Sequence, residues 1–411
     1  MSLTTGACEL SASVRDALAA LEQAGLTRKL RLVQRCGPVR VRLDETEVVS
    51  FASCDYLGLA THPRLAQAAA RAAQEHGTSA GGARLLCGHD EQVAALEHEL
   101  AAFFGAPRAL VFSSGYLANL GLIPALVGPG DLLVSDALVH ASSVDACRLS
   151  GAQVEVVPHN DLDAVASALV GRPSGSRALV LVEGVYSMDG DLAPLPALSA
   201  LCEQHGAQLL VDDAHGLGAV GPGGRGTVCA TGAPLPALQV GNLGKALGSY
   251  GAFVLLDESL RELLLQTVRS FVFTCALPPP VVAAAREALL VLGDEPWRVA
   301  QAQDRARSLR AALAEQGLTP GIPAETGDLA PPQDSCVRSG ALSTPIVPVL
   351  VGDGARALSA SALLLKRGWL APAVRPPTVP RGGERLRLTV SADHTDEHCR
   401  ALARDLAEVL S

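Results

Sequence analysis

The stretches "VEGVYSMDGDLAPL" (Val182–Leu195) and "VDDAHGLG" (Val211–Gly218) each begin as an apolar strand and then turn polar. Acids, a serine and a histidine follow these strands at points where a plain turn would be enough to reverse the chain. In open α/β sheets, ligands bind beyond the carboxyl ends of the strands. We therefore expect Ser187, Asp212 and His215 to face a crevice along one edge of a sheet.

The segment around these two stretches alternates in character. From about Tyr56 to Pro280, short apolar runs are separated by stretches of helical periodicity, which is typical of β–α units and a largely parallel sheet. The predicted strands are Ala109–Phe112, Val154–Val157, Ala178–Val182, Gln208–Val211, Leu238–Gly241 and Gly251–Leu256. The predicted fold class is therefore α/β, with a mostly parallel central sheet.

The two ends of the chain follow other patterns. Residues from about Ala12 to Leu32 are predicted to form an amphipathic helix, and "VRVRLDETEVVSF" a short strand-like segment after it. Beyond the helix breaker "LPPPVV" we expect long helices and a Gly- and Pro-rich loop from about Gly317 to Gln333. A second α/β unit would follow, with strands in "TPIVPVLVG" and "RLRLTVS", a helix around 355–367 and a final helix. The predicted segments are 1–50 (N-terminal helix and strand), 51–283 (large domain) and 284–411 (small C-terminal domain).

Composition and charge narrow the classes of function. The 411 residues are 48% hydrophobic and 18% charged, which allows a sizeable core. A net charge of -9 and the lack of a Lys/Arg run argue against nucleic acid as a partner. The uncharged run from Ala109 to Gly130 is interrupted by serine, glycine, asparagine and proline, so we interpret it as a strand and a helix, not as a membrane span.

The cysteines indicate a reducing compartment. Ten cysteines are scattered singly along the chain and form no Cys-x-x-Cys pair. This spacing predicts neither a disulfide framework nor a metal site, and reduced thiols in the cytoplasm are the simpler interpretation. The N-terminus lacks a basic start followed by an apolar block, so we expect no signal peptide.

Two charged residues follow strands in surroundings that favour a chemical role. A carboxylate at Asp212, where an apolar strand ends, is costly unless it meets a cation or several donors. It is either a helix N-cap acid or the partner of a protonated pyridine nitrogen. Lys245, in "NLGKALGSYGAF", lies among small and apolar residues. It is either a surface lysine or a desolvated amine able to form a Schiff base.

Four further motifs are less specific when each is taken alone. In "FSSGYLAN" a strand runs into a helix start, whose free N–H groups suit a phosphate. His140, just after a strand, is either a capping histidine or a residue that covers a flat ring. The glycine-rich "GTSAGGARLLCGHD" does not fit a P-loop. Arg375 and Arg387, on and after a proline-stiffened segment, either recognise carboxylates or are solvated.

Together and in this order, the motifs "DYLGL", "GTSAGGARLLCG", "FSSGYLAN", "HAS", "EGVYSMDGD", "VDDAHG", "GKALG" and "RPPTVP" resemble those of the α-oxoamine synthases. Members of this family depend on pyridoxal 5'-phosphate (PLP) and have fold type I, the aspartate aminotransferase-like fold with a smaller α/β C-terminal domain. The resemblance runs from about Arg28 to the C-terminus. It implies PLP as the cofactor and a homodimer in which both chains build each site.

The resemblance implies roles for individual residues around the cofactor. Lys245 would bind PLP covalently, Asp212 would pair with its pyridine nitrogen, and His215 would hydrogen-bond its ring hydroxyl. His140 would stack on the ring, and with Lys245 and Asp212 it would form the catalytic group. The other expected contacts to PLP come from Gly115, Tyr116, Ser187, Asn242 and Cys275.

Three positions depart from the family pattern. Asn242 stands where a Thr or Ser usually meets the phosphate, and Cys275 where a Thr usually reaches the partner subunit's phosphate. Ala83 stands where Ser or Thr is usual. The amide of Asn242 can still donate a hydrogen bond, whereas a thiol is a poor donor. We expect these departures to affect how tightly the cofactor binds.

The resemblance also implies the substrates and their contacts. Arg28 would meet the distal carboxylate of the acyl substrate, while Arg375 and Thr378 would meet the amino acid with support from Arg387, and His140 would face it. "SCDYLGL" and "AVRPPTVP" are similar to the motifs of members that join L-alanine to pimeloyl-CoA or pimeloyl-acyl carrier protein. Two alternatives stay open. One is another acyl-CoA:amino-acid C-acyltransferase of the family, and the other is a catalytically silent partner subunit with the same fold.

Overall fold

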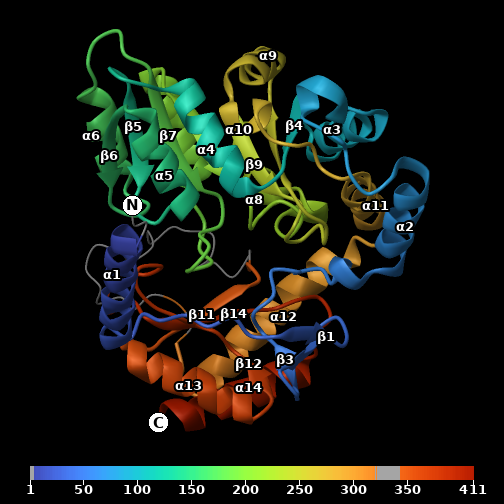
Figure 1. Cartoon of the computed structure of the whole chain (residues 1–411), viewed down its shortest axis with the longest axis vertical. Helices are drawn as coiled ribbons and strands as arrows, with labels where there is room; N and C mark the ends of the chain where they lie inside the picture. Colours follow the sequence, from blue (N-terminus) through green and yellow to red (C-terminus); the bar gives the residue numbers. More distant parts are fainter. Residues whose placement is uncertain (1–3, 320, 322–342) are drawn as a thin grey trace.

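The computed structural model describes residues 4–319, 321 and 343–411, with side chains from residue 11 onward. In Figure 1 an upper part runs from α2 to α11, and a lower part is built from both ends of the chain. The Gly- and Pro-rich loop expected from about Gly317 to Gln333 falls largely outside the described residues.

A seven-stranded sheet organises the upper part, in the order β4-β10-β9-β8-β7-β5-β6. Strand β10 runs antiparallel to its neighbours β4 and β9, and the other neighbouring strands are parallel. The strands are Arg108–Phe112 (β4), Leu132–Asp136 (β5), Gln153–Val157 (β6), Ala178–Glu183 (β7), Gln208–Asp212 (β8), Leu238–Asn242 (β9) and Ala252–Leu256 (β10). The prediction of a mostly parallel central sheet is confirmed.

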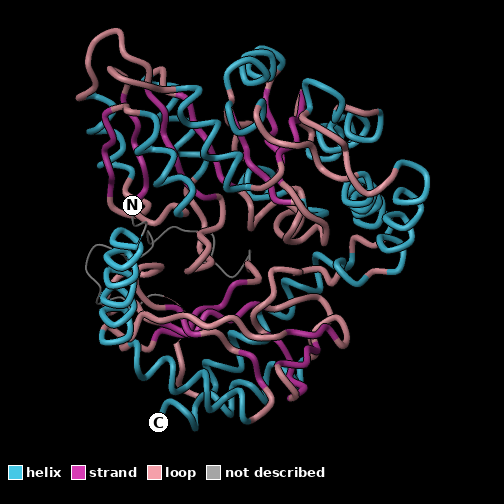
Figure 2. Tube along the Cα trace, viewed as in Figure 1, coloured by secondary structure: helices cyan, strands magenta, loops and turns pink. Residues whose placement is uncertain are grey.

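The strands are apolar along most of their length because helices lie on both faces of the sheet (Figure 2). In β4, Leu110 and Phe112 pack into one core, whereas the alternate residues Ala109 and Val111 pack into another. The helices are Pro63–His76 (α2), Glu91–Phe104 (α3), Gly115–Leu126 (α4), Ala141–Ser150 (α5), Leu162–Val170 (α6), Leu195–His205 (α7), Gly226–Thr231 (α8), Glu258–Thr267 (α9), Arg269–Val272 (α10) and Pro279–Asp294 (α11), with short turns at Leu59–Thr61 (η1), Arg84–Gly88 (η2) and Pro222–Gly224 (η3).

The lower part contains two small sheets that share one core with three helices. One sheet has the order β11-β14-β13, and the other, β1-β2-β3-β12, joins the N-terminal hairpin to the C-terminal residues. Its elements are Val33–Arg35 (β1), Arg40–Leu43 (β2), Thr46–Ser50 (β3), Trp297–Glu315 (α12), Ile346–Leu350 (β11), Gly354–Lys366 (α13), Trp369–Leu370 (β12), Ala373–Val374 (β13), Arg385–Thr389 (β14) and Asp396–Leu410 (α14). The predicted C-terminal α/β unit is confirmed.

The N-terminal segment differs from the prediction in two ways. Helix α1 spans Thr4–Gln23, so the helix expected from Ala12 to Leu32 ends early. The reason is Gly25, which has a left-handed backbone (φ 66°) that does not continue a helix. The expected single strand-like segment is a hairpin of β2 and β3, with Asp44 at positive φ (54°) in the turn.

The domain boundaries at residues 50 and 283 stay predictions. Residue 283 lies inside α11, and helix α12 passes between the two parts. Val299, near the start of α12, packs into the upper core, while Leu309, further along, packs into the lower core. The two parts are therefore connected by continuous helical packing.

The uncharged run from Ala109 to Gly130 forms β4 followed by α4, as expected. Ser114 caps α4, because its hydroxyl oxygen accepts the N–H of Leu117 at 3.2 Å. Within the described part of the chain, no helix is long and apolar enough to cross a membrane.

We expect a core truncation in β8 to destabilise the protein. Leu210 is fully buried (0% exposed), so Leu210→Ala should lower the free energy of unfolding by about 2–5 kcal/mol, through lost apolar burial and a cavity. Leu149→Ala, at a position on α5 that is 62% exposed, is the matched control and should change it by less than about 0.5 kcal/mol. Urea titration followed by circular dichroism compares the two variants, and equal midpoints would contradict the expectation.

Candidate active site

Three polar residues meet at the carboxyl ends of β8 and β9. Asp212 ends β8, His215 lies in the turn that follows, and Lys245 comes shortly after β9. The Lys245 amine (Nζ) lies 2.8 Å from His215 Nε2, and the opposite ring nitrogen, Nδ1, lies 2.6 Å from the Tyr56 hydroxyl. A lysine, a histidine and a tyrosine from three distant segments therefore form one hydrogen-bonded chain.

Neutral donors hold the buried Asp212 carboxylate. Asn119 Nδ2 donates to its Oδ2 at 2.6 Å, and the backbone N–H of Ala214 donates to its Oδ1 at 3.2 Å. The next helix, α8, begins only at Gly226, so Asp212 is not the helix N-cap acid that was the alternative interpretation. Because its donors are uncharged, a cation placed against Asp212 would be strongly favoured.

A second buried carboxylate, Glu183, stands beside Asp212. Glu183 ends β7 and is in register with Asp212 on β8. Its Oε2 accepts the N–H of Ser187 at 2.9 Å, while Oε1 is buried without a hydrogen-bond partner in the described structure. Burial, and then the Asp212 charge, raises the pKa of Glu183 well above its ordinary value. Glu183 therefore keeps its proton to a higher pH than a solvated glutamate.

The environment of Lys245 favours the neutral amine. Burial lowers the pKa of Lys245, although the nearby Asp212, Cys54 and Glu183 oppose this change. Burial and the Lys245 charge also hold the pKa of His215 well below its ordinary value. Lys245 is therefore not the solvated surface lysine of the alternative interpretation. We refer to Tyr56, Glu183, Asp212, His215 and Lys245 as the strand-end cluster.

His140 is connected to this cluster through side-chain hydrogen bonds. It caps α5, where its Nδ1 accepts the Ser142 N–H at 3.2 Å and lies 2.7 Å from Ser142 Oγ. Ser142 Oγ lies 3.0 Å from the same Asn119 amide that holds Asp212. Desolvation lowers the pKa of His140, against the effect of Asp212. The residue keeps an exposed surface, so capping the helix does not prevent it from covering a flat ligand.

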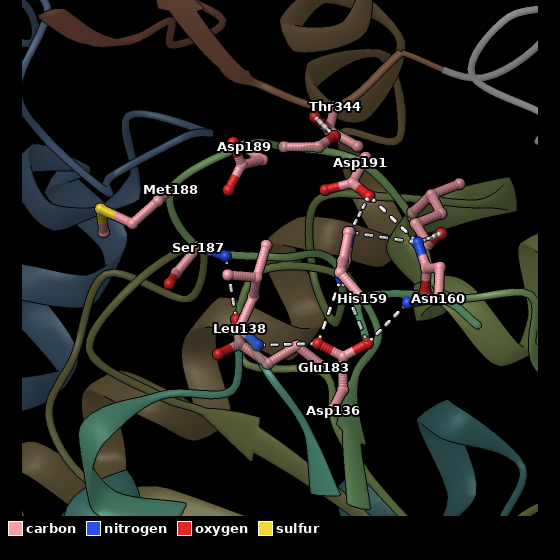
Figure 3. Close-up of polar contacts among 12 residues, drawn as sticks. Asp136, Leu138, His159, Asn160, Glu183, Ser187, Met188, Asp189, Asp191 and Thr344 are labelled. Carbon is pink, nitrogen blue, oxygen red and sulfur yellow. Dashed lines mark hydrogen bonds and ion pairs between the residues drawn. The ribbon is translucent and has the colours of Figure 1, made fainter. Parts of the chain in front are cut away.

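A contact between Ser187 and Arg387 connects the lower part of the molecule to the strand-end cluster. Ser187 lies in the loop after β7, beside Glu183 (Figure 3), and its backbone carbonyl accepts a hydrogen bond from Arg387 Nε at 2.5 Å. Both side chains are buried. The Arg387 charge contributes to the lowered pKa values of His215 and Lys245. Strand β14 thus adds a fixed cation to a site built mainly by the upper sheet.

The start of α4 lies against Asn242. A Cβ atom added to Gly115 would come within 3.3 Å of Asn242 Nδ2, so glycine lets these segments approach closely. Asn242 Oδ1 accepts the N–H of Gly244 at 2.8 Å, which leaves its NH₂ group beside the helix. Tyr116 is exposed and its hydroxyl donates to Asp145. A helix N-terminus with an amide donor next to it is suited to a phosphate.

Cys275 lies in an extended segment that pairs with Ala83. The N–H of Ala276 donates to the carbonyl of Gly82 at 3.0 Å. Cys275 is exposed, and it lines the same small cavity as Ser113. Two of the three departures from the family pattern, Ala83 and Cys275, are therefore neighbours in space.

Arg28, Arg375 and Thr378 lie together in a second group, at the junction of the N-terminal segment and β13. Arg375 Nη2 donates to the carbonyl of Thr27 at 2.7 Å, which brings Arg28 close to it, and the N–H of Thr378 donates to the carbonyl of Arg375 at 3.1 Å. Arg28 and Thr378 are exposed. Of the three arginines expected to bind carboxylates, Arg387 lies at the strand-end cluster and the other two lie here.

Three residues of the site were not selected from the sequence, namely Tyr56, Asn119 and Glu183. Each lies inside a motif noted above, "DYLGL", "FSSGYLAN" or "VEGVYSMDGD". Glu183 could have been found, because an acid at the end of an apolar strand is the pattern that selected Asp212. Tyr56 and Asn119 carry no such signal, since their partners are 159 and 93 residues away along the chain.

The cysteines and acids form neither disulfides nor a metal site where the structure describes them. All eight cysteines with described side chains are free. In the same residues, no group of three or more His, Cys, Asp or Glu side chains could hold a metal ion.

Comparisons with known proteins give the chain's relatives. The profile of a family described as aminotransferase class I and II matches residues 46–406. The chain is 45% identical to the 8-amino-7-oxononanoate synthase of Burkholderia thailandensis, over 94% of this chain and 95% of that protein. It is 44% identical to that of Geobacter sulfurreducens, over 97% and 98%. A serine palmitoyltransferase from S. paucimobilis, solved with a bound PLP–myriocin aldimine, has a TM-score of 0.86 at 29% identity, covering 100% of this chain and 98% of that one.

We expect the Lys245 amine to become reactive at a lower pH than an ordinary lysine, whose pKa is about 10.4. Because Asp212 stabilises the ammonium form, Asp212→Asn should move the pKa of Lys245 further down. The chain has three lysines, Lys29, Lys245 and Lys366, so peptides labelled with trinitrobenzenesulfonate can be assigned by mass spectrometry across a pH series.

The internal control is Lys366, whose labelling curve should be the same in both proteins. A Lys245 curve that coincides with that of Lys366, or that moves to higher pH in Asp212→Asn, would contradict the assigned electrostatics. The measurement is made on the protein without added PLP.

Proposed function

Because the chain belongs to the class I and II aminotransferase family, and within it to the α-oxoamine synthases, we propose that it condenses L-alanine with a pimeloyl thioester. The acyl donor would be pimeloyl-CoA or pimeloyl-acyl carrier protein, and the product 8-amino-7-oxononanoate, an intermediate of biotin synthesis. A bond forms between Cα of alanine and the acyl carbon, the thioester C–S bond breaks to release the thiol, and the alanine carboxylate leaves as CO₂. The observation that carries the proposal is the buried Asp212 beside a lysine of lowered pKa.

The residues at the site fit PLP, which is the cofactor of this family. The buried Asp212 carboxylate is held by neutral donors, so a protonated ring nitrogen would supply a fitting positive charge. Lys245 offers the amine that carbonyl cofactors require. Ser113 Oγ and Asn119 Oδ1 are buried without partners in the described structure. The start of α4 provides backbone N–H groups for the phosphate.

PLP would supply an electron sink that stabilises negative charge on the alanine Cα. Asp212 would keep a proton on the pyridine nitrogen, because a buried carboxylate favours a positive charge beside it. Lys245 would hold the cofactor and then, as a neutral amine, accept the Cα proton at Nζ. His215 and Tyr56 would aim Nζ through the hydrogen-bonded chain described above. His140, at the exposed edge, would cover one face of the ring.

Arginines would hold the carboxylates of the two substrates. Arg387 is buried beside the strand-end cluster, which suits it to the amino-acid end, with Arg375 and Thr378 supporting it. Arg28 is exposed next to Arg375 and would meet the distal carboxylate of the acyl chain. Bidentate guanidinium contacts would offset the free-energy cost of desolvating these carboxylates and would orient both substrates.

The reaction itself is the direct test of this proposal. We expect the purified protein with PLP to release CoA thiol from pimeloyl-CoA only when L-alanine is present, with 8-amino-7-oxononanoate detected by mass spectrometry. Lys245→Ala should abolish turnover, because it removes both the anchor of the cofactor and the base for the Cα proton. Lys366→Ala, a change at an exposed end of α13, is the matched control and should keep wild-type turnover.

The alternatives give different outcomes in the same assay. Activity with another amino acid or acyl-CoA, but not with this pair, would indicate another C-acyltransferase of the family. A protein that binds no PLP and turns over no pair would indicate the catalytically silent subunit. Turnover retained in Lys245→Ala would contradict the role given to that residue.

We also propose that the protein is a homodimer in the cytoplasm. An apolar surface next to the Ala83–Cys275 pair supports the dimer, since Leu85, Leu86 and Phe273 are 55%, 85% and 72% exposed there. The free cysteines support a reducing compartment.

The dimer predicts the mass in solution. Light scattering after gel filtration should give about twice the 42.2 kDa of the chain. Leu86→Asp should shift the protein to the monomer, because it places a charge in an apolar contact, whereas Leu235→Asp on another exposed site should not. A wild-type monomer with full PLP occupancy would contradict the proposed assembly.

A further inference from the structure

A buried histidine lies between two carboxylates, near Glu183 of the strand-end cluster (Figure 3). His159, just after β6, is completely buried. Its Nδ1 lies 3.1 Å from both oxygens of Asp136, the last residue of β5, and its Nε2 lies 2.8 Å from Asp191 Oδ2, in the loop after β7. The edge of the His159 ring meets the Tyr186 ring, with centroids 4.3 Å apart. Nothing in the proposed reaction uses these residues directly.

The geometry defines the charge of this ring. Carboxylates only accept hydrogen bonds, so a ring with one on each side carries a proton on both nitrogens. Burial alone would lower the pKa of His159, but Asp136 and Asp191 together outweigh it and raise the pKa to about 10. The same two acids are tied to the neighbouring Asn160, whose N–H donates to Asp136 at 2.8 Å and whose amide donates to Asp191 at 3.2 Å.

Asp191 anchors a loop, residues 184–192, that connects the upper and lower parts of the molecule. Toward the sheet, the loop N–H of Ser187 is held by Glu183. Toward the lower part, Gly190 O accepts the Thr344 hydroxyl at 2.6 Å, and Asp189 forms a buried ion pair with Arg385 of β14. The carbonyl of Ser187 meets Arg387 on the same strand, as described above.

Electrostatics makes this loop dependent on the histidine. Asp189 and Asp191 are both buried within it, and Asp136 lies close by. Arg385 offsets the charge of Asp189, and the protonated His159 is the one positive charge shared by Asp136 and Asp191. Without the imidazolium, two buried carboxylates would lose their counter-charge, which is strongly destabilising for the arrangement that contains them.

We propose that His159 is a positioning residue: its protonated ring ties Asp136 on β5 to Asp191 in the loop 184–192, and so determines where Ser187 and Arg387 stand beside the strand-end cluster. The residue acts on the reaction through Arg387 and the amino-acid carboxylate that it would bind. This inference rests on the proposed function for the identity of the substrate, but not for the state of the ring.

The first measurement addresses the ring. Nitrogen NMR spectra are recorded for the wild-type holoenzyme and the His159→Gln variant, both labelled with ¹⁵N-histidine. The signals that are missing from the variant's spectrum are those of His159. Both ring nitrogens should stay protonated well above the ordinary histidine pKa of about 6.5. A His159 ring that loses a proton near that value would overturn the proposal, whatever reaction the enzyme catalyses.

The second measurement separates positioning from stability. For His159→Gln, two constants should rise about 10-fold to 100-fold per PLP-loaded site: KM for L-alanine and the dissociation constant of L-alanine, measured from the change in PLP absorbance. A rise of this size is expected when a hydrogen bond between an arginine and a carboxylate is weakened. The double variant His159→Gln/Asp191→Asn should recover part of this loss, because it removes an unpaired carboxylate together with the cation. His98→Gln, at an exposed position on α3, is the control and should match wild type.

Each outcome decides the proposal. Unchanged KM and dissociation constant per loaded site, with only a smaller folded fraction, would show a purely structural role and overturn it. If His159→Gln does not fold, Asp191→Asn replaces it, since it keeps the ring and should raise the same two constants; wild-type values there would also overturn the proposal. If the wild type does not use L-alanine, the proposed function fails instead, and the titration is repeated with the amino acid that the enzyme does bind.

Discussion

The carboxylate of Asp212, buried where an apolar strand ends, is the constraint on which the site depends. Its hydrogen-bond donors are neutral, so they do not cancel its negative charge. That charge acts on the pKa values of the neighbouring groups. Glu183, in register with it, has a raised pKa, while burial lowers the pKa of Lys245 and of His215. The result is a site in which a positively charged heterocycle and a neutral amine are both favoured, which is what a PLP enzyme needs before any substrate arrives.

A second cluster of charge, away from the reacting groups, connects the two parts of the molecule. The loop 184–192 is held to the sheet by Glu183 and His159 and to the lower part by Thr344 (Figure 3). Arg385 and Arg387 of β14 also hold it to the lower part. Helix α12 supports the same junction through continuous packing into both cores. Arg387, which we propose to bind the amino acid, comes from β14, and the residues proposed to hold the cofactor come from the sheet. Under this proposal the junction sets the distance between them.

Much of the fold could be predicted from local patterns. Continuous apolar runs identified the buried strands, because a strand covered on both faces is apolar on both sides and does not alternate between polar and apolar residues. The prediction was wrong where one residue decides the outcome: Gly25 ends α1 early, and the turn at Asp44 splits one strand-like segment into a hairpin. In the site, motif order led to Lys245, Asp212 and His215. It did not lead to Tyr56 or Asn119, whose contribution is a contact across the fold.

The sequence by itself determined the residue types at the strand ends, the mostly parallel sheet and the family to which the chain belongs. Each of these depends on short motifs and on their spacing along the chain, which the sequence gives directly. Tertiary structure alone decided which polar groups face one another. His159, 32 residues before Asp191 and 23 after Asp136, looks like any loop histidine until parallel strands bring the three together. Burial then decides their charge, because a buried ion is tolerated only where the fold supplies its counter-ion.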